Sequence, residues 1–158
     1  MVAKGTISIE HISKGFPDQK SQQGKIQILE DVSLHIEPGS FVSIIGPSGC
    51  GKSTLLRMIS GFLFPDEGTV QVDGKEVKGP GVDRGFMFQD HVLFPWLTIY
   101  DNIAFGLKAQ GVYPDLKDNV DKIIHKVGLD GYADHYPYQV SGGMQQRASL
   151  ARALIGRP

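Results

Sequence analysis

A glycine-rich segment, "GPSGCGKST" at residues 46–54, constrains the fold of this chain more than any other feature. It follows a short apolar run, "FVSII", and precedes "TLLRMIS", whose apolar residues have helical spacing. Glycines let successive backbone N–H groups turn toward one anion, and the helix that follows adds its positive N-terminus. This is the pattern of a phosphate-binding loop between a buried strand and a helix. The sequence therefore predicts an α/β fold built around such a loop.

Each residue type in the loop has a chemical reason to be there. Lys52 is expected to reach the β- and γ-phosphates of a nucleoside triphosphate, and Ser53 is expected to offer its hydroxyl to Mg²⁺. Cys50 occupies a spacer position, and we expect no redox role for it. The predicted binding residues are Gly46, Pro47, Ser48, Gly49, Cys50, Gly51, Lys52, Ser53 and Thr54. The loop alone leaves small-molecule kinases, GTPases, helicases and transport ATPases open.

Composition and charge exclude several classes of protein. The chain has 158 residues, of which 41% are hydrophobic and 21% charged, as in one soluble globular domain. Its net charge of −1 argues against a protein built to bind nucleic acid. The single cysteine cannot form an internal disulfide, which fits a reducing compartment. The sequence shows neither a signal peptide nor an apolar run near the roughly 20 residues of a membrane span. We expect a cytosolic protein that could dock on a membrane protein.

Strand patterns dominate the chain before Gln89. Alternating β-branched residues and short apolar runs predict strands over residues 6–13, 26–36, 40–45, 68–77 and 84–88. The polar segment at residues 16–25 is typical of a loop, and Asp73-Gly74 is a strong hairpin turn. These patterns indicate a mixed sheet.

Helical patterns follow Gln89. Residues 97–107 predict a helix with Thr98 as N-cap and Asp101 three residues on. Residues 115–128 predict a second helix that ends at Gly128. Its apolar face is formed by Leu116, Val120, Ile123, Ile124 and Val127. We expect a nucleotide-binding β and phosphate-loop part at 1–90, a helical subdomain at 91–146, and a last motif with its helix at 141–158.

That last motif, "VSGGMQQR", predicts a second helix start able to bind an anion. Ser141 can cap the helix, and Gly142 and Gly143 leave its first backbone N–H groups uncovered. Taken alone, an ordinary capped helix explains the same residues.

Together, the two motifs resemble the ATP-binding subunit of ABC transporters, in which a phosphate loop, a glutamine loop and an LSGGQ signature follow in that order. Here Val140 replaces the first Leu and Met144 the last Gln, while the Ser-Gly-Gly core is kept. The resemblance runs from about residue 6 to 158. It implies an ABC-type P-loop NTPase fold with an antiparallel β subdomain, a phosphate-loop strand and helix, and a helical subdomain. The signature residues implied to meet nucleotide are Ser141, Gly142, Gly143, Met144 and Gln145.

The resemblance implies roles for two more residues, with ATP and Mg²⁺ as the cofactors. Gln89 in "GFMFQD" matches the glutamine-loop residue, which contacts Mg²⁺ and the attacking water. Phe16 in "SKGFP" matches the aromatic residue that stacks on adenine. Without the resemblance, Gln89 is an ordinary polar loop residue and Phe16 is a candidate for the core.

Residues 79–107 narrow the resemblance to importers of nitrate, sulfonates, taurine and related small anions. The Pro95-Trp96 pair is part of that similarity. The segment "LFPW" fits a hydrophobic corner of the core, or an exposed patch that receives a helix of the permease. The implied partners are a transmembrane permease, a second ATPase subunit paired head to tail and, indirectly, a solute-binding protein. The implied location is the cytoplasmic face of the cell membrane.

In the family, an apolar strand ending in Asp-Glu and a switch histidine follow the signature helix. Here no Asp or Glu follows Gly143. All five histidines precede the signature, namely His11, His35, His91, His125 and His135. We therefore expect a single incomplete ABC ATPase domain without the later core strands and catalytic groups. Such a chain should neither hydrolyse ATP nor fold as a stable monomer, because residues 41–45 and 84–88 would keep open strand edges.

Two other functions fit part of the sequence. A non-hydrolysing nucleotide-binding module that occupies a permease or a partner ATPase would need the phosphate loop without the catalytic carboxylate. A small phosphate-loop kinase is less well supported, because no acceptor site rich in Arg or Asp is evident and the Ser-Gly-Gly helix would have no purpose.

Overall fold

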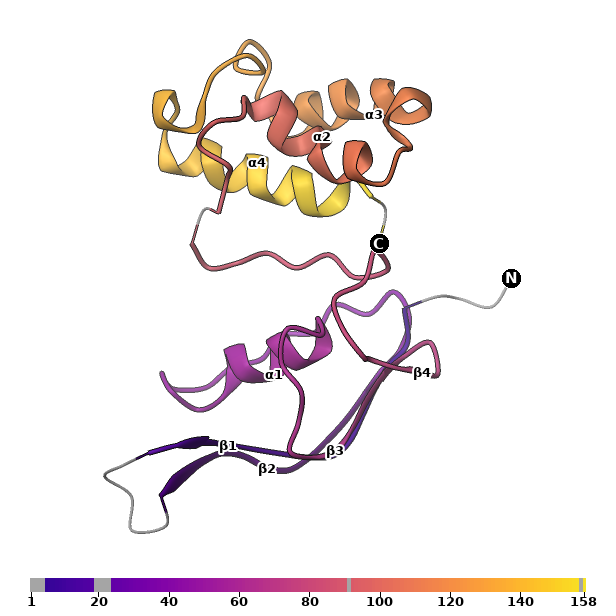
Figure 1. Ribbon diagram of the computed structural model, residues 1–158, viewed down its shortest axis with the longest axis vertical. Helices are drawn as coiled ribbons and strands as arrows, with labels where there is room; N and C mark the ends of the chain where they lie inside the picture. The colour runs from indigo at the N-terminus through magenta and orange to yellow at the C-terminus, as the bar shows by residue number, and fades with distance from the viewer. Residues whose placement is uncertain (1–4, 19–23, 91, 157) are drawn as a thin grey trace. The chain divides into compact units, whose positions relative to one another are not determined.

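The computed structural model describes residues 5–18, 24–90, 92–156 and 158 (Figure 1). The chain forms two compact units, Met1–Gly81 and Val82–Pro158. Each unit has its own cluster of buried apolar side chains. The division falls after Gly81, whereas the pattern in the sequence changes after Gln89.

The first unit contains a four-stranded sheet in the order β2-β1-β3-β4. Its strands are β1 (Ile7–Pro17), β2 (Lys25–Ile36), β3 (Glu67–Val72) and β4 (Lys75–Glu76). All pairings are antiparallel, so the predicted mixed sheet is wrong for the described residues. The predicted loop at 16–25 is also too long, because both of its ends belong to strands; its residues 19–23 lie outside the described residues.

A bulge in β1 decides which of its side chains face the core. Ile9 and Ile12 are both buried although they are three positions apart, which would put them on opposite faces of a regular strand. The register shifts between them, and His11 has a φ of 50°. Gly68 of β3 lies against this bulge, where a Cβ atom would overlap the carbonyls of Glu10 and His11. The sequence alternation alone could not give this arrangement.

Helix α1 (Lys52–Ile59) covers one face of this sheet (Figure 1). Its Leu55 and Met58 are buried among the apolar residues of the sheet. Gly61, with a φ of 81°, stands just beyond the helix, where a Cβ atom would overlap the backbone at Gly79. The predicted helix and its glycine stop are confirmed, as is the Asp73-Gly74 hairpin turn between β3 and β4.

Two predicted strands are absent from the described part of the chain. Residues 41–45 and 84–88 have no regular secondary structure and pair with no strand, because the sheet of the described residues consists only of β1 to β4. A strand exists only where a neighbour accepts its backbone hydrogen bonds, and the apolar sequence cannot supply that neighbour. Phe41 is 98% exposed and Ile45 is 91% exposed, so these side chains lie outside the core of their unit.

The second unit is helical. It contains α2 (Ile99–Ala109), α3 (Tyr113–Lys126), a 3-10 turn (Pro137–Gln139) and α4 (Gly142–Leu154). The predicted apolar face of α3 is confirmed, since Val120 and Ile124 are buried and the other three residues pack against the same cluster. The Thr98 cap is confirmed too, because its hydroxyl accepts a hydrogen bond from the Asp101 N–H at 3.1 Å. In the part of the chain that the structure describes, none of the helices has the length and apolar character needed to cross a bilayer.

Candidate functional site

The phosphate loop, residues 46–54, is curled where it enters α1. Gly49 has a φ of 82°, and Gly51, which precedes the first residue of the helix, has a φ of 94°. Both values lie in the left-handed region that glycine adopts without strain. A Cβ atom at Gly51 would also lie 2.7 Å from Cδ2 of Leu29 on β2. The sequence therefore needs glycine here, both for the curl and for the close approach to the sheet.

The ammonium of Lys52 lies on the inner side of this curl. Its Nζ donates hydrogen bonds to the carbonyls of Gly46 at 2.8 Å and Pro47 at 2.6 Å, and lies 3.6 Å from Sγ of Cys50. A Cβ atom at Gly46 would come within 2.8 Å of that sulfur, so glycine keeps the inside of the loop open. A positive charge is thus held by carbonyls of the glycine-rich loop, where a phosphate chain would need it.

The first turn of α1 presents the other groups that a phosphate ligand needs. The first hydrogen bond along the helix runs from the Leu55 N–H to the Gly51 carbonyl at 2.9 Å, so the amides before it point out of the helix end. This turn contains no acidic residue, and Ser53 is exposed. Its hydroxyl is an oxygen ligand of the kind that Mg²⁺ prefers. These residues fit a magnesium–nucleotide.

Phe16 lies at the end of β1 and is not part of the core. Its side chain is 36% exposed, and Nζ of Lys14 lies 5.8 Å above the centre of its ring. The ring lines a cavity of about 460 Å³ in the first unit. The interpretation of Phe16 as an ordinary core residue is therefore wrong, while its contact with adenine stays a prediction.

The signature segment begins α4 as the sequence predicts. Ser141 is the N-cap, and its Oγ accepts a hydrogen bond from the Met144 N–H at 3.3 Å. Gly142 and Gly143 are exposed, so their amides are accessible at the helix start. Met144 instead packs against the core of its unit, and Nε2 of Gln145 donates to the Pro137 carbonyl at 2.8 Å. We therefore expect these last two side chains to hold the motif in place.

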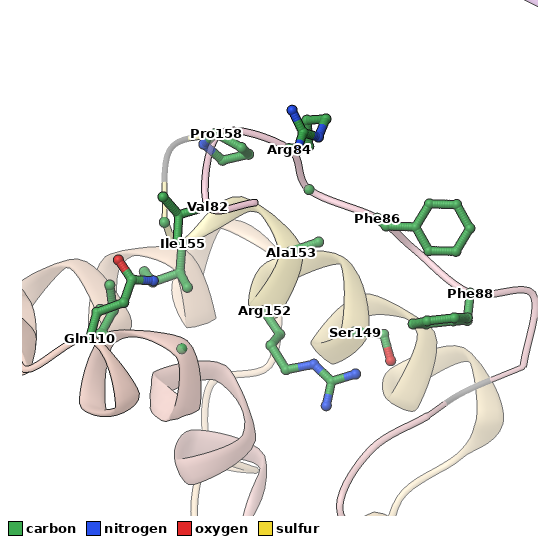
Figure 2. Close-up of a pocket in the computed structure, with 14 residues that line it drawn as sticks. Val82, Arg84, Phe86, Phe88, Gln110, Ser149, Arg152, Ala153, Ile155 and Pro158 are labelled. Carbon is green, nitrogen blue, oxygen red and sulfur yellow. The ribbon is translucent and has the colours of Figure 1, made fainter. Parts of the chain in front are cut away.

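Gln89 is exposed. The run before it, residues 84–88, packs against the signature helix α4. A cavity of about 270 Å³ is lined by residues of this run, of α2 and of α4. Figure 2 shows Arg84, Phe86, Phe88 and Ser149 among the residues around it. At Gly85 the backbone comes so close that a Cβ atom would lie 2.9 Å from a carbonyl of α4. Gln89 and the signature therefore belong to one compact unit, and the phosphate loop belongs to the other.

Asn102, which the sequence analysis did not single out, organises the "LFPW" segment. It is fully buried on α2, and its Oδ1 accepts a hydrogen bond from the Phe94 N–H at 2.8 Å. Its Nδ2 donates to the carbonyls of Phe94, Leu97 and Thr98 at 3.0 to 3.1 Å. A polar residue on the apolar face of a predicted helix is the signal that could have identified it.

Arg152 of α4 holds the same segment from the other side. It donates to the carbonyl of Val92, and its guanidinium lies 5.4 Å above the centre of the Phe94 ring. Burial lowers the pKa of this guanidinium from its ordinary value. The ring of Phe94 also contacts those of Trp96 and Phe105, at centroid distances of 5.5 and 4.7 Å. Leu93 is buried in the core of the unit while Trp96 remains 70% exposed, so the segment is anchored at one end and presents an aromatic surface at the other.

The sequence is similar to those of curated ATP-binding proteins of importers. The chain is 46% identical over 153 residues to the aliphatic sulfonates import ATP-binding protein SsuB of Bacillus cereus, which covers 97% of this chain and 59% of that protein. It is 42% identical over 153 residues to the taurine import ATP-binding protein TauB of Jannaschia sp., which covers 96% and 56%. The chain thus spans less than two thirds of the length of these relatives.

A solved structure supports the same assignment. The dimeric, post-hydrolysis state of the ATP-binding cassette MJ0796 bound to ADP and Pi aligns with a TM-score of 0.83 and 32% identity, covering 96% of this chain and 70% of that one. The sequence profile described as "ABC transporter" matches residues 29–158, which is most of the chain. The family and fold predicted from the two motifs are confirmed: the chain belongs to the ABC transporter family.

Proposed function

We propose that this chain is the nucleotide-binding part of the ATP-binding subunit of an ABC importer for a small anion such as a sulfonate, taurine or nitrate. The observation that carries the proposal is the phosphate loop, in which Lys52 lies against the carbonyls of Gly46 and Pro47 at the start of α1. The named relatives serve the import of sulfonates and taurine. In the complete protein, ATP binding and hydrolysis would drive uptake of the solute at the cytoplasmic face of the membrane.

In this proposal the loop amides and Lys52 would bind the phosphates, Ser53 would offer its hydroxyl to Mg²⁺, and Phe16 would stack on adenine. The contact of Gln89 with Mg²⁺ is carried over from the family resemblance alone. ATP supplies the phosphoryl group, and Mg²⁺ neutralises charge on its oxygens. The direct test is titration of the protein with ATP in the presence and absence of Mg²⁺. Tight binding that depends on the cation is expected, and a lack of ATP binding would contradict the proposal.

We further propose that two subunits pair head to tail, so that Ser141 and the amides of Gly142 and Gly143 meet nucleotide held by the partner. The matching cassette structure is dimeric, and these three residues are exposed here. Ser141→Arg should therefore bind ATP as tightly as the wild type but lose ATP-dependent dimerisation, measured by analytical ultracentrifugation. Ser141→Ala is the control for the helix cap, which contributes about 1 kcal/mol. Dimers of unchanged strength in Ser141→Arg would contradict the role of the signature.

The aromatic surface at Trp96 is the proposed docking site for the permease. An exposed aromatic ring fixed by its neighbours is typical of residues that dominate interfaces, at about 2 kcal/mol or more each. Trp96→Ala should reduce co-purification with the permease at least about tenfold and leave ATP affinity unchanged. The control is Tyr138→Ala, which removes an aromatic side chain that is 75% exposed in the same unit. Equal losses in both variants would argue against a specific docking site at Trp96.

A further inference from the structure

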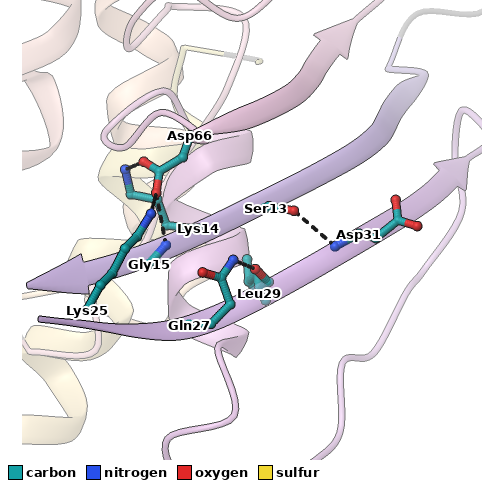
Figure 3. Close-up of polar contacts among 8 residues, drawn as sticks. All are labelled: Ser13, Lys14, Gly15, Lys25, Gln27, Leu29, Asp31 and Asp66. Carbon is teal, nitrogen blue, oxygen red and sulfur yellow. Dashed lines mark hydrogen bonds and ion pairs between the residues drawn. The ribbon is translucent and has the colours of Figure 1, made fainter. Parts of the chain in front are cut away.

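A single carboxylate, that of Asp66, joins three segments of the first unit. Its Oδ1 accepts a hydrogen bond from Nζ of Lys14 at 2.6 Å, and its Oδ2 accepts from Nζ of Lys25 at 2.8 Å (Figure 3). Oδ2 also accepts from the backbone N–H of Gly15 at 3.0 Å. The Asp66 N–H in turn donates to the carbonyl of Ser13 at 2.8 Å. The segment before β3 is thereby tied to β1 and to the start of β2.

The residues that make these contacts lie next to Phe16 in the fold. Gly15 precedes it directly, and Lys14 lies two residues before it. Lys14 is over the aromatic ring, and a Cβ atom at Gly15 would overlap the stem of Lys25. Asp66 therefore fixes both the backbone that enters Phe16 and the cation that lies above its ring.

The same residues line the cavity of about 460 Å³ next to the ring. Hydrogen bonds from Lys14 and then Lys25 hold the pKa of Asp66 well below its usual range, so the carboxylate is ionised at neutral pH. A ring held in a fixed orientation loses less entropy on stacking than a free one.

We propose that Asp66 is a positioning residue for nucleotide base recognition, which holds Phe16 in the orientation that stacks on adenine. The inference rests on the proposed ATP-binding function. Without the carboxylate, the Gly15 amide loses its partner and two lysine ammonium groups lose their common counter-ion. The ring then moves relative to the cavity. The loss should affect binding of the base and not binding of the phosphates, because the phosphate loop makes no part of this cluster.

The test compares ATP with inorganic tripolyphosphate, which can occupy the phosphate loop but has no base. Base stacking accounts for a factor of about 5 to 150 in affinity. Asp66→Ala should therefore lower ATP affinity on the order of tenfold, while tripolyphosphate affinity changes by less than about twofold. Asp66→Asn, which keeps an acceptor for the Gly15 amide, should fall between this variant and the wild type.

Asp73 provides a matched control in the same sheet. Its Oδ1 accepts hydrogen bonds from the amides of Gly5 at 2.8 Å and Thr6 at 3.0 Å, just before β1 begins. Asp73→Ala also removes a carboxylate that caps backbone amides, and it adds strain because Asp73 has a φ of 50°. This variant should destabilise the sheet at least as much as Asp66→Ala and leave the ratio of ATP to tripolyphosphate affinity unchanged.

A fluorescence measurement reports on the ring itself. Phe16→Trp in a Trp96→Phe background places the only indole at the proposed stacking position. ATP should quench its emission, and adding Asp66→Ala should reduce the maximal quench at saturating ATP. Equal losses of ATP and tripolyphosphate affinity in Asp66→Ala, or a quench that does not change, would overturn the inference alone. A wild-type protein that binds tripolyphosphate and ATP equally would do the same, whereas one that binds neither would overturn the proposed function as well.

Discussion

Lys52→Ala should lower ATP affinity by about 1.5–3 kcal/mol, or roughly 10- to 150-fold. The variant removes a charge-assisted hydrogen bond to the phosphates. It also leaves the carbonyls of Gly46 and Pro47, which now contact the ammonium at 2.8 and 2.6 Å, facing an anion without a cation between them. Because both effects act in the same direction, we expect the loss near the upper end of this range.

Calorimetric titration with ATP at constant ionic strength is the measurement. Arg57→Ala is the matched control, since Arg57 is an exposed cation in the last turn of the same helix. It should change ATP affinity less than about twofold, because long-range attraction is largely screened at physiological salt. Tripolyphosphate should lose affinity in Lys52→Ala as ATP does. If Lys52→Ala bound ATP as tightly as the wild type, residues 46–54 would not be a phosphate loop.

Asn102→Leu should lower the free energy of unfolding of the helical unit by about 3 kcal/mol. Leucine has the same branched heavy-atom skeleton as asparagine, but its two methyl groups are bulkier than the amide oxygen and nitrogen, so some overpacking adds to the loss. The Phe94 N–H and the Leu97 carbonyl lose the buried amide as their partner, and each group left unsatisfied costs about 1–3 kcal/mol when water cannot reach it. The carbonyls of Phe94 and Thr98 lose it too, but they still accept hydrogen bonds from the backbone amides of Leu97 and Asn102. We expect the segment that carries Trp96 to move outward, which admits water and limits the total loss.

Trp96 is the only tryptophan of the chain and lies in the segment that Asn102 fixes, so its emission during urea unfolding reports this change directly. Asn119→Leu on α3 is the control, because Asn119 is only half-buried. It should alter the free energy of unfolding by no more than about 0.5 kcal/mol. Similar transition midpoints for Asn102→Leu and the wild type would show that the buried amide is not what holds this segment.

The sequence by itself determined the features that depend on neighbouring residues. The spacing of glycines before Lys52 predicted the curled loop and the helix after it, because both follow from backbone freedom and helix-end geometry. Thr98 and Ser141 were recognisable as caps, since a cap bonds to an amide only three residues away. The turn at Asp73-Gly74 also depends only on neighbouring residues, because it joins two strands that follow each other in the chain. These short-range signals, together with the order of the motifs, were enough to predict the family.

Only the tertiary structure decided what depends on residues far apart in the chain. Asp66 meets Lys14 across 52 positions, and Arg152 meets the carbonyl of Val92 across 60, so no local pattern could pair them. A bulge placed Ile12 in the core. The apolar runs at 41–45 and 84–88 have strand-like sequences, yet neither is a strand in the described structure. Their conformation depends on a hydrogen-bonding neighbour, and a chain segment cannot specify by its own composition where that neighbour will be.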